Sequence, residues 1–314
     1  MVEKKSAFQL VANIVMILLA LCCLFPFLLL VMSSFTDETT LIREGYSIFP
    51  SKFGLQSYLY LFKNAAKIGK AYGITILITA VGTTVSLLMT VMMAYPLSRH
   101  EFFGRNVCAF YVFFTMLFNG GLVPTYIMYT RYLHIKNTLW ALLIPSLLIS
   151  AFYVIMMRTY FTTNVPEAVI EAARIDGAGE WRILFTIVLP MSLPMIATMA
   201  LLIGLGYWND WKNGLYYLTD SRLYSIQNML NQMLKDVQFL KSGADASAAA
   251  DLTQDMPSVG IKMAIAVIGA LPIMIIYPFF QKYFVKGITI GAVKGCLRRI
   301  VPIQKRVPGS YPLL

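Results

Sequence analysis

The sequence predicts an all-α membrane protein with six transmembrane helices, on three observations. Of its 314 residues, 58% are hydrophobic and only 13% are charged, and the apolar residues gather in long blocks. Six blocks are long enough to cross a hydrocarbon core of roughly 30 Å as helices, and none contains Asp, Glu, Lys or Arg. The blocks also lack the alternation typical of barrel strands, which favours helices. The predicted spans are residues 11–32, 72–95, 107–129, 138–157, 184–207 and 263–281.

The first block follows Lys4 and Lys5, as the apolar part of a secretory signal peptide would. It is about 22 residues long, however, and the residues after it, 33–37, form no small-x-small cleavage site. We therefore expect a retained span.

The net charge of +11 has two explanations, nucleic-acid binding and membrane topology. In a membrane protein, topology and contact with anionic lipid are simpler, so we predict membrane lipids and no nucleic acid as partners. With both termini in the cytoplasm, the basic tail and seven other basic residues lie inside. These are Lys4, Lys5, Arg99, Arg105, Arg158, Arg174 and Arg182. The opposite orientation stays open, because cytoplasmic termini leave five basic residues outside. These are Arg43, Lys52, Lys63, Lys67 and Lys70.

Two segments around the spans carry further patterns. Residues 58–70 have amphipathic helical spacing, which fits either a helix on the membrane surface or a cap packed on the bundle. The third span is interrupted by Asn119-Gly120-Gly121 and Pro124. Irregular backbone at that depth must be buried in protein or line a wet cavity, so Asn119 is a candidate residue of a substrate pathway.

The domain organisation follows from these spans. We predict a cytoplasmic N-terminus at residues 1–10, a six-span domain at 11–295 and a basic tail of unknown role at 296–314. Two connections within the domain are unusually long, a cytoplasmic loop at 158–183 and an external loop at 208–260.

The sequence lacks the groups that would power transport or catalysis. No ionisable residue lies in a span, which disfavours a secondary transporter or channel, although a sodium site built from backbone carbonyls escapes this test. No G-x-x-x-x-G-K-S/T, H-E-x-x-H or G-x-S-x-G motif occurs, and His100 and His134 are far apart. The four cysteines form no C-x-x-C pair. We predict no catalytic, metal or cofactor site, so a separate subunit must supply the work.

The cytoplasmic loop shows where that subunit would attach. Asn164 is predicted to cap a short helix, with Pro166 in its first turn and Gly177 and Gly179 at its end. A second helix would run from about Glu180 into the fifth span. The short helix carries charges beside small residues, which fix a partner's orientation and let it approach closely. These residues are Glu167, Glu171, Ala172, Ala173, Arg174 and Asp176.

A pattern with fixed spacing begins in this loop and continues into the fifth span. It consists of Glu171-Ala172-Ala173, then Gly177 after three residues, Ile187 after nine more, and Leu189-Pro190 after one more. It resembles the EAA signature of binding-protein-dependent ABC importer permeases, in which this helix is the coupling helix seated in a cleft of the ATPase. The resemblance implies the type I importer permease fold with a cytoplasmic coupling helix. It also implies that Glu171 and Asp176 contact the ATPase, that the two alanines pack in its groove, and that Gly177 allows the turn.

Further positions are similar to the maltose-type carbohydrate permease family. They are Asp176-Gly177-Ala178, Pro194, Trp208-Asn209-Asp210 and the LplC-like ending at residues 287–295. The resemblance covers about residues 6–295 and implies a permease for oligosaccharides or other complex sugars in the bacterial cytoplasmic (inner) membrane. The implied partners are a second homologous permease, two ATP-binding subunits that bind ATP and Mg, and an extracytoplasmic sugar-binding lipoprotein.

The start of the external loop combines aromatic rings with amides and carboxylates, the side chains that bind sugars. These residues also fit an interfacial aromatic belt. The candidates for the substrate pathway or for contact with the binding protein are Trp208, Asn209, Asp210, Trp211, Tyr216 and Tyr217.

Overall fold

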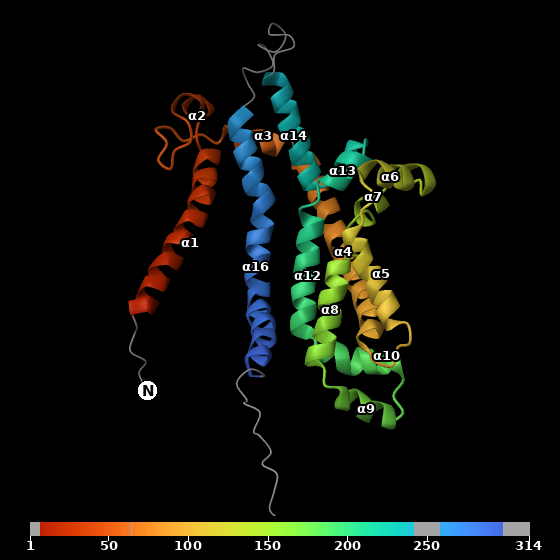
Figure 1. Cartoon of the computed structure of the whole chain (residues 1–314). Helices are drawn as coiled ribbons and strands as arrows, with labels where there is room; N and C mark the ends of the chain where they lie inside the picture. Colours follow the sequence, from red (N-terminus) through yellow and green to blue (C-terminus); the bar gives the residue numbers. More distant parts are fainter. Residues whose placement is uncertain (1–6, 64, 242–257, 298–314) are drawn as a thin grey trace, which may run out of the picture. The chain divides into compact units, whose positions relative to one another are not determined.

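The computed structural model describes residues 7–63, 65–241 and 258–297, and side chains within 9–63, 65–235 and 259–278 (Figure 1). Over these residues the chain is helical and forms no strand, apart from an isolated antiparallel bridge between Thr36 and Phe53. The all-α prediction is confirmed. Lys4, Lys5 and the tail from residue 298 lie outside the described residues.

Three of the six uncharged blocks form continuous helices long enough to cross a membrane. They are α1 (Ala7–Ser34), α4 (Ala65–Ser98) and α16 (Ser258–Leu297). Each extends the predicted block, because an apolar helix continues into flanking residues that still favour helical backbone.

The third and fifth blocks are bent. The third divides into α5 (Arg105–Leu117), α6 (Leu122–Ile127) and a π-helical turn (Met128–Tyr132), with a bend of 110°. Gly121 has φ +82° at this break, which confirms the predicted interruption. The fifth divides into α10 (Glu180–Ile183), a π-helical turn (Leu184–Val188), α11 (Leu189–Met191) and α12 (Leu193–Trp208), with a bend of 83°.

The fourth block does not form one helix, and the prediction of a single span at 138–157 is wrong in this respect. It contains α7 (Trp140–Leu143), an irregular stretch, and the start of α8 (Ala151–Asn164). Pro145 lacks a backbone N–H and Ser146 has φ +63°, which stops the helix. Ser86 of α4 donates a hydrogen bond to the Leu147 carbonyl (3.3 Å), which satisfies one backbone acceptor in the stretch.

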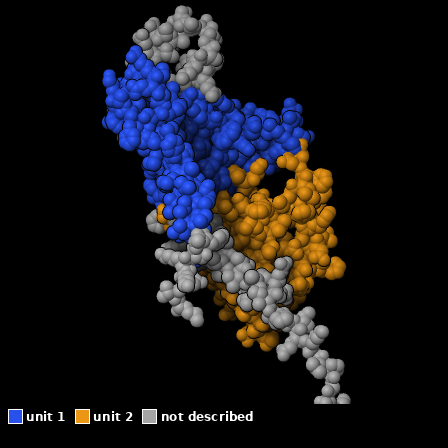
Figure 2. All heavy atoms as spheres, turned by 60° about the vertical axis from the view of Figure 1, so that its left-hand side comes forward, with its two compact units in different colours: residues 1–81, 121–145, 205–276 blue, residues 82–120, 146–204, 277–314 orange. Residues whose placement is uncertain are grey.

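The chain forms two compact units, coloured in Figure 2. Unit 1 comprises residues 1–81, 121–145 and 205–276, and unit 2 comprises 82–120, 146–204 and 277–314.

The core of unit 1 joins α3 (Gln56–Lys63), the first turns of α4, α14 (Ile226–Lys241) and α16. Its buried residues are Leu61, Ala71, Ile226, Leu230, Ile261, Ala264 and Ile265. Leu61 is only 3% exposed, so the structure favours a packed cap for the amphipathic segment at 58–70. Glu38 of α2 (Glu38–Glu44) accepts hydrogen bonds from the N–H groups of Val259 and Gly260 at the start of α16 (both 2.9 Å).

In unit 2, α5 packs against α8, and the buried side chains of α8 include Val154, Met157 and Phe161. The short helix α9 (Glu167–Ile175) follows α8 and precedes α10. This arrangement places α9 between two helices of the same unit (Figure 1).

Candidate functional site

The helix α9 has one face against its own unit and one face open. Ile170 is 2% exposed and Ala173 is also buried, one turn apart on the inner face. The outer stripe consists of Ala168, Glu171, Ala172 and Ile175, all exposed. Ile175 is 86% exposed, and a large apolar side chain so open beside charged groups is typical of a contact surface. Of the two alanines predicted to pack in a partner's groove, only Ala172 is open.

The start of α9 differs from the prediction. Asn164 is the last residue of α8, and its amide donates to Thr163 Oγ1 (2.9 Å), so it does not cap α9. Pro166 is the N-cap residue, with no side-chain cap. The physical reason is the proline itself, which keeps Val165 extended (ψ 111°), so the helix begins only after Pro166.

The end of α9 agrees with the prediction. Gly177 has φ +80°, a left-handed backbone that favours glycine. Its N–H donates to the Arg174 carbonyl (2.9 Å), and the Ala178 N–H donates to the Ala173 carbonyl (2.9 Å). These bonds satisfy the last carbonyls of the helix and reverse the chain toward α10.

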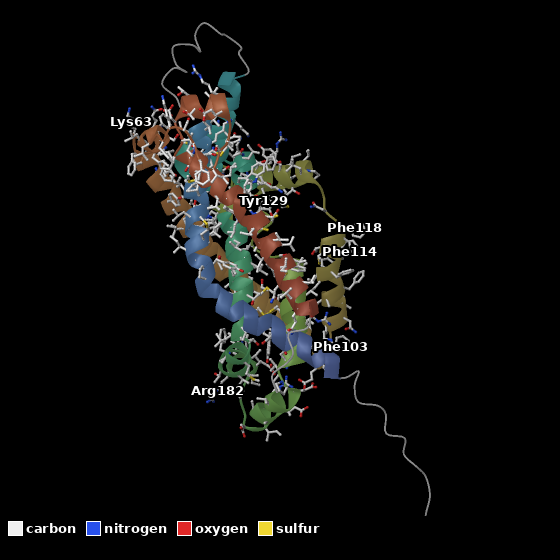
Figure 3. The ribbon with its side chains drawn as sticks, turned by 90° about the vertical axis from the view of Figure 1, so that its left-hand side faces the viewer. Lys63, Phe103, Phe114, Phe118, Tyr129 and Arg182 are labelled. Carbon is white, nitrogen blue, oxygen red and sulfur yellow. The ribbon has the colours of Figure 1, made fainter. Side chains whose placement is uncertain are left out.

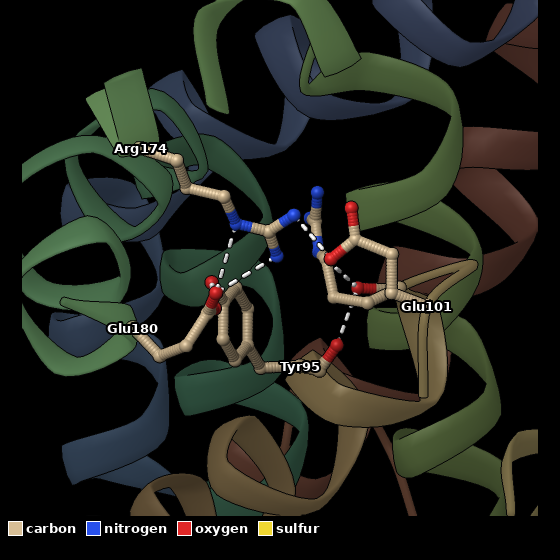
Figure 4. Close-up of polar contacts among 6 residues, drawn as sticks. Tyr95, Glu101, Arg174 and Glu180 are labelled. Carbon is tan, nitrogen blue, oxygen red and sulfur yellow. Dashed lines mark hydrogen bonds and ion pairs between the residues drawn. The ribbon is translucent and has the colours of Figure 1, made fainter. Parts of the chain in front are cut away.

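An ion-pair network holds α9 in place (Figure 4). The Arg174 guanidinium pairs with Glu101, in the loop after α4, and with Glu180, the first residue of α10 (Nη2 to Oε1, 2.8 Å). Glu180 also accepts a hydrogen bond from the Tyr95 hydroxyl of α4 (2.5 Å). The hydrogen bond that Arg174 donates to Glu101 raises the pKa of Arg174, so the guanidinium stays charged. Arg174 thereby ties α9 directly to the loop after α4 and to α10, and Glu180 extends the network to Tyr95 of α4.

The end of α4 is fastened by two further arginines. The Arg99 guanidinium lies over the Tyr95 ring, 5.0 Å from its centroid, and its Nε donates to Ser98 Oγ (3.2 Å). Arg158 of α8 donates from Nε to the Leu97 carbonyl (3.0 Å). Burial lowers the pKa of Arg99.

The sequence analysis missed Tyr95, Arg99, Glu101 and Glu180 as part of this site. Arg99 and Glu101 stand directly after an uncharged span, and Glu180 begins a predicted helix, which are weak signals. The pairing of Glu101 with Arg174 joins residues 73 positions apart, so it leaves no local pattern in the sequence.

The predicted substrate-pathway residues fall into three groups. Trp208 and Tyr217 are buried in unit 1, where Trp208 Nε1 donates to the Gly269 carbonyl (3.4 Å) and Tyr217 stacks on Tyr126 (5.8 Å between ring centroids). Asp210 accepts from the Asn213 N–H (3.3 Å) at the start of α13 (Lys212–Tyr217). The exposed members of unit 1 are Asn209, Trp211 and Tyr216, whereas Asn119 is exposed at the α5–α6 break in unit 2.

No cluster of three or more His, Cys, Asp or Glu side chains suited to a metal ion occurs within the described residues.

Comparison with known proteins places these features in a family. Residues 5–290 match the family model described as the binding-protein-dependent transport system inner membrane component. The chain is 35% identical over 299 residues to the polygalacturonan/rhamnogalacturonan transport system permease protein YtcP of Bacillus subtilis, covering 93% of this chain and all of YtcP. It is 39% identical over 272 residues to Protein LplC of the same organism, covering 86% and 89% of the two chains.

A solved structure agrees with these relatives. The chain is similar, with a TM-score of 0.76 and 28% identity over 90% of its length, to a chain of a bacterial ABC transporter involved in the import of the acidic polysaccharide alginate, 99% of which is covered. The type I importer permease fold expected from the sequence is therefore confirmed. The chain belongs to the family of binding-protein-dependent transport system inner membrane components, as an ABC importer permease.

Proposed function

We propose that this permease imports oligosaccharides, and that α9 is the coupling helix through which separate ATPase subunits move its membrane spans. The observation that carries this proposal is the two-sided construction of α9. Its outer stripe is open for a partner, while Arg174 ties its inner side to α4 and α10. A helix held in this way passes an external push to the membrane segments as a rigid body.

The proposal gives a role to each predicted residue of α9 and of the turn after it. Glu167, Glu171 and Asp176 orient the ATPase by charge, and Ala172 and Ile175 fill an apolar groove in it. Arg174 and Ala173 act within this chain, and Gly177 provides the turn. ATP and Mg would be held by the ATPase subunits, with α9 and both termini in the cytoplasm.

The remaining partners follow from surfaces that this chain leaves open. None of the most apolar 18-residue window of α1 is buried in the chain, which supports contact with lipid and with a second, homologous permease. Phe110 and Phe114 of α5 and Phe118 directly after it are exposed, and the rings of Phe114 and Phe118 lie 4.3 Å apart (Figure 3 labels these two). An external binding lipoprotein would deliver the cargo to the loop at 208–260.

The cargo class is supported by the relatives, whose names concern polygalacturonan and rhamnogalacturonan in one case and alginate in the other. Asn209, Trp211 and Tyr216 are the exposed candidates for contact with such a chain of sugars, because exposed rings stack on sugar C–H faces and the amide pairs with hydroxyls.

The test is the charge reversal Glu171→Lys in the complete transport system. It places a cation where the proposal requires an acid facing the ATPase, so sugar-stimulated ATP hydrolysis should fall at least about tenfold, as expected for loss of a charge-assisted contact. The matched control is Glu44→Lys, which reverses an exposed acid of α2 whose carboxylate accepts a bond from Ser51. Unchanged sugar-stimulated hydrolysis in Glu171→Lys, with the complex intact, contradicts the coupling role.

A further inference from the structure

A cavity of about 450 Å³ lies in unit 2, behind the coupling helix and at the end of α4. Its volume falls in the range of small-molecule sites. Met92, Pro96 and Leu184 form apolar wall, and Arg99, Glu101 and Glu180 supply charged groups. Met92 belongs to the apolar helix and Arg99 comes directly after it, about 10 Å further along at 1.5 Å per residue. The cavity therefore spans the boundary between the hydrocarbon and the polar zone.

The cavity wall carries charges of both signs, and Arg99 and Glu180 attract one another without forming an ion pair. One guanidinium, Arg174, serves both Glu101 and Glu180, so this group of three carries one surplus negative charge. Arg99 has no carboxylate within ion-pair distance among the described residues, and its Nη2 is shielded from water without a hydrogen-bond partner there. A half-buried guanidinium with one unpartnered Nη2 group is incompletely compensated, so an anion near Arg99 would be stabilised.

The apolar part of the cavity is open in the chain alone. Met92 is 39% exposed, Phe102 42% and Trp181 62%. Large side chains at the end of a membrane span are normally covered by lipid, and tryptophan is enriched at this depth. An acyl chain along Met92 and Trp181 would cover the wall and hold a head group beside the charges.

From this geometry we propose that the cavity binds a membrane phospholipid that carries both a phosphate and a primary ammonium, such as phosphatidylethanolamine. The phosphate pairs with the Arg99 guanidinium, and the ammonium donates to the carboxylates of Glu101 and Glu180. A head group with one charge of each sign matches a wall that presents both a guanidinium and carboxylates. The lipid contacts the residues that clamp Arg174, so it supports α9 from inside the chain. This role is separate from docking of the ATPase.

The experiment uses the full-length chain with the subunits that copurify with it. The complex is stripped of lipid in detergent and titrated with phosphatidylethanolamine, phosphatidylglycerol or phosphatidylcholine of the same acyl chains, and bound lipid is counted by native mass spectrometry. Phosphatidylethanolamine should bind most tightly. Arg99→Gln should weaken its binding about tenfold, the loss expected for a charge-assisted hydrogen bond. Glu101→Gln should weaken phosphatidylethanolamine and leave phosphatidylglycerol unchanged.

Arg182→Gln is the matched control, because Arg182 is an exposed arginine next to Trp181 that does not line the cavity (Figure 3). It should change binding of none of the three lipids. Equal effects of Arg99→Gln and Arg182→Gln, or equal binding of the three lipids, overturn the proposal. Binding of glycerophosphoethanolamine as tight as that of the whole lipid assigns the cavity to a soluble ligand and also overturns it. If Arg99→Gln fails to fold, Glu101→Gln decides alone, since the Glu101 side chain is 65% exposed.

Discussion

Gly177 and Gly179 form a natural comparison after the end of α9. A Cβ added to either residue would meet open space, but Gly177 has φ +80° and Gly179 has φ −71°. Gly177→Ala should therefore lower the free energy of unfolding by about 1–2 kcal/mol, the cost of a left-handed conformation for alanine. Gly179→Ala should change it by less than about 0.5 kcal/mol. Thermal unfolding of the two purified variants checks the difference, and equal shifts would show that the turn is not strained by a side chain.

Replacing Arg174 should affect the coupling of ATP hydrolysis to uptake more than it affects stability. Its partners Glu101 and Glu180 are 65% and 53% exposed at their side chains, so water screens both ion pairs. Arg174→Gln should cost only about 1 kcal/mol of stability, yet free α9 from α4 and α10. We expect ATP hydrolysis to continue while sugar uptake per ATP falls several-fold.

Arg174→Lys is the control for charge alone, because lysine keeps the cation but not the planar fork that serves two carboxylates. It should restore part of the uptake per ATP. If Arg174→Gln took up as much sugar per ATP as the original chain, the clamp would not be part of the coupling path.

The first turn of helix α16 is hydrogen-bonded to the carboxylate of Glu38, which is far away in the sequence. Glu38 accepts from the Val259 and Gly260 N–H groups, two donors that have no partner inside the helix (both 2.9 Å). Glu38→Ala should destabilise the chain by about 1–2 kcal/mol, and Glu38→Gln by less, since an amide oxygen still accepts one bond. Glu44→Ala, an exposed acid of the same helix, is the control. Thermal unfolding and exchange of the amides at 259–260 report the loss, and equal shifts for positions 38 and 44 would contradict it.

The helices themselves were largely predictable, and their breaks were so only where the cause is local. Uncharged blocks predicted α1, α4 and α16, and Gly121 marked the bend after α5. The break at Pro145 was missed, because a proline inside an apolar block is also compatible with a kinked span. The capping error at Asn164 has the same origin, since the effect of Pro166 on Val165 outweighed the preference of asparagine for caps.

Packing between distant segments was not predictable from one sequence. Thr75 Oγ1 accepts from the Ile226 N–H (2.8 Å) across 151 residues, and Trp208 turns inward to Gly269. Trp208 and Tyr217 therefore lie in a protein core, although aromatic residues after a span equally favour a sugar contact or an interfacial belt. The helix α9 and its turn at Gly177 were predictable because the pattern that carries them is contiguous, whereas the Arg174 clamp is assembled by the fold.

The chain supplies membrane-crossing helices, but its sequence contains no motif that would supply energy for transport. The six blocks contain no Asp, Glu, Lys, Arg or His and the sequence has no phosphate-binding loop, which disfavours proton coupling or ATP binding by this chain. The apolar face of α1 also remains uncovered by the rest of the chain. Both features indicate that function requires the assembled system, and they disfavour a secondary transporter or channel.

We therefore expect this permease to transport no oligosaccharide by itself. In liposomes with only this permease, an imposed sugar, sodium or proton gradient should drive no oligosaccharide uptake above that of empty vesicles. Uptake should appear only when the second permease, the ATPases with ATP and Mg, and the binding protein are present, and it should be lost with Glu171→Lys. The gradient arms address the sodium site that backbone carbonyls could form without any charged residue. Gradient-driven uptake by the single chain would mean that α9 is not needed to move these helices.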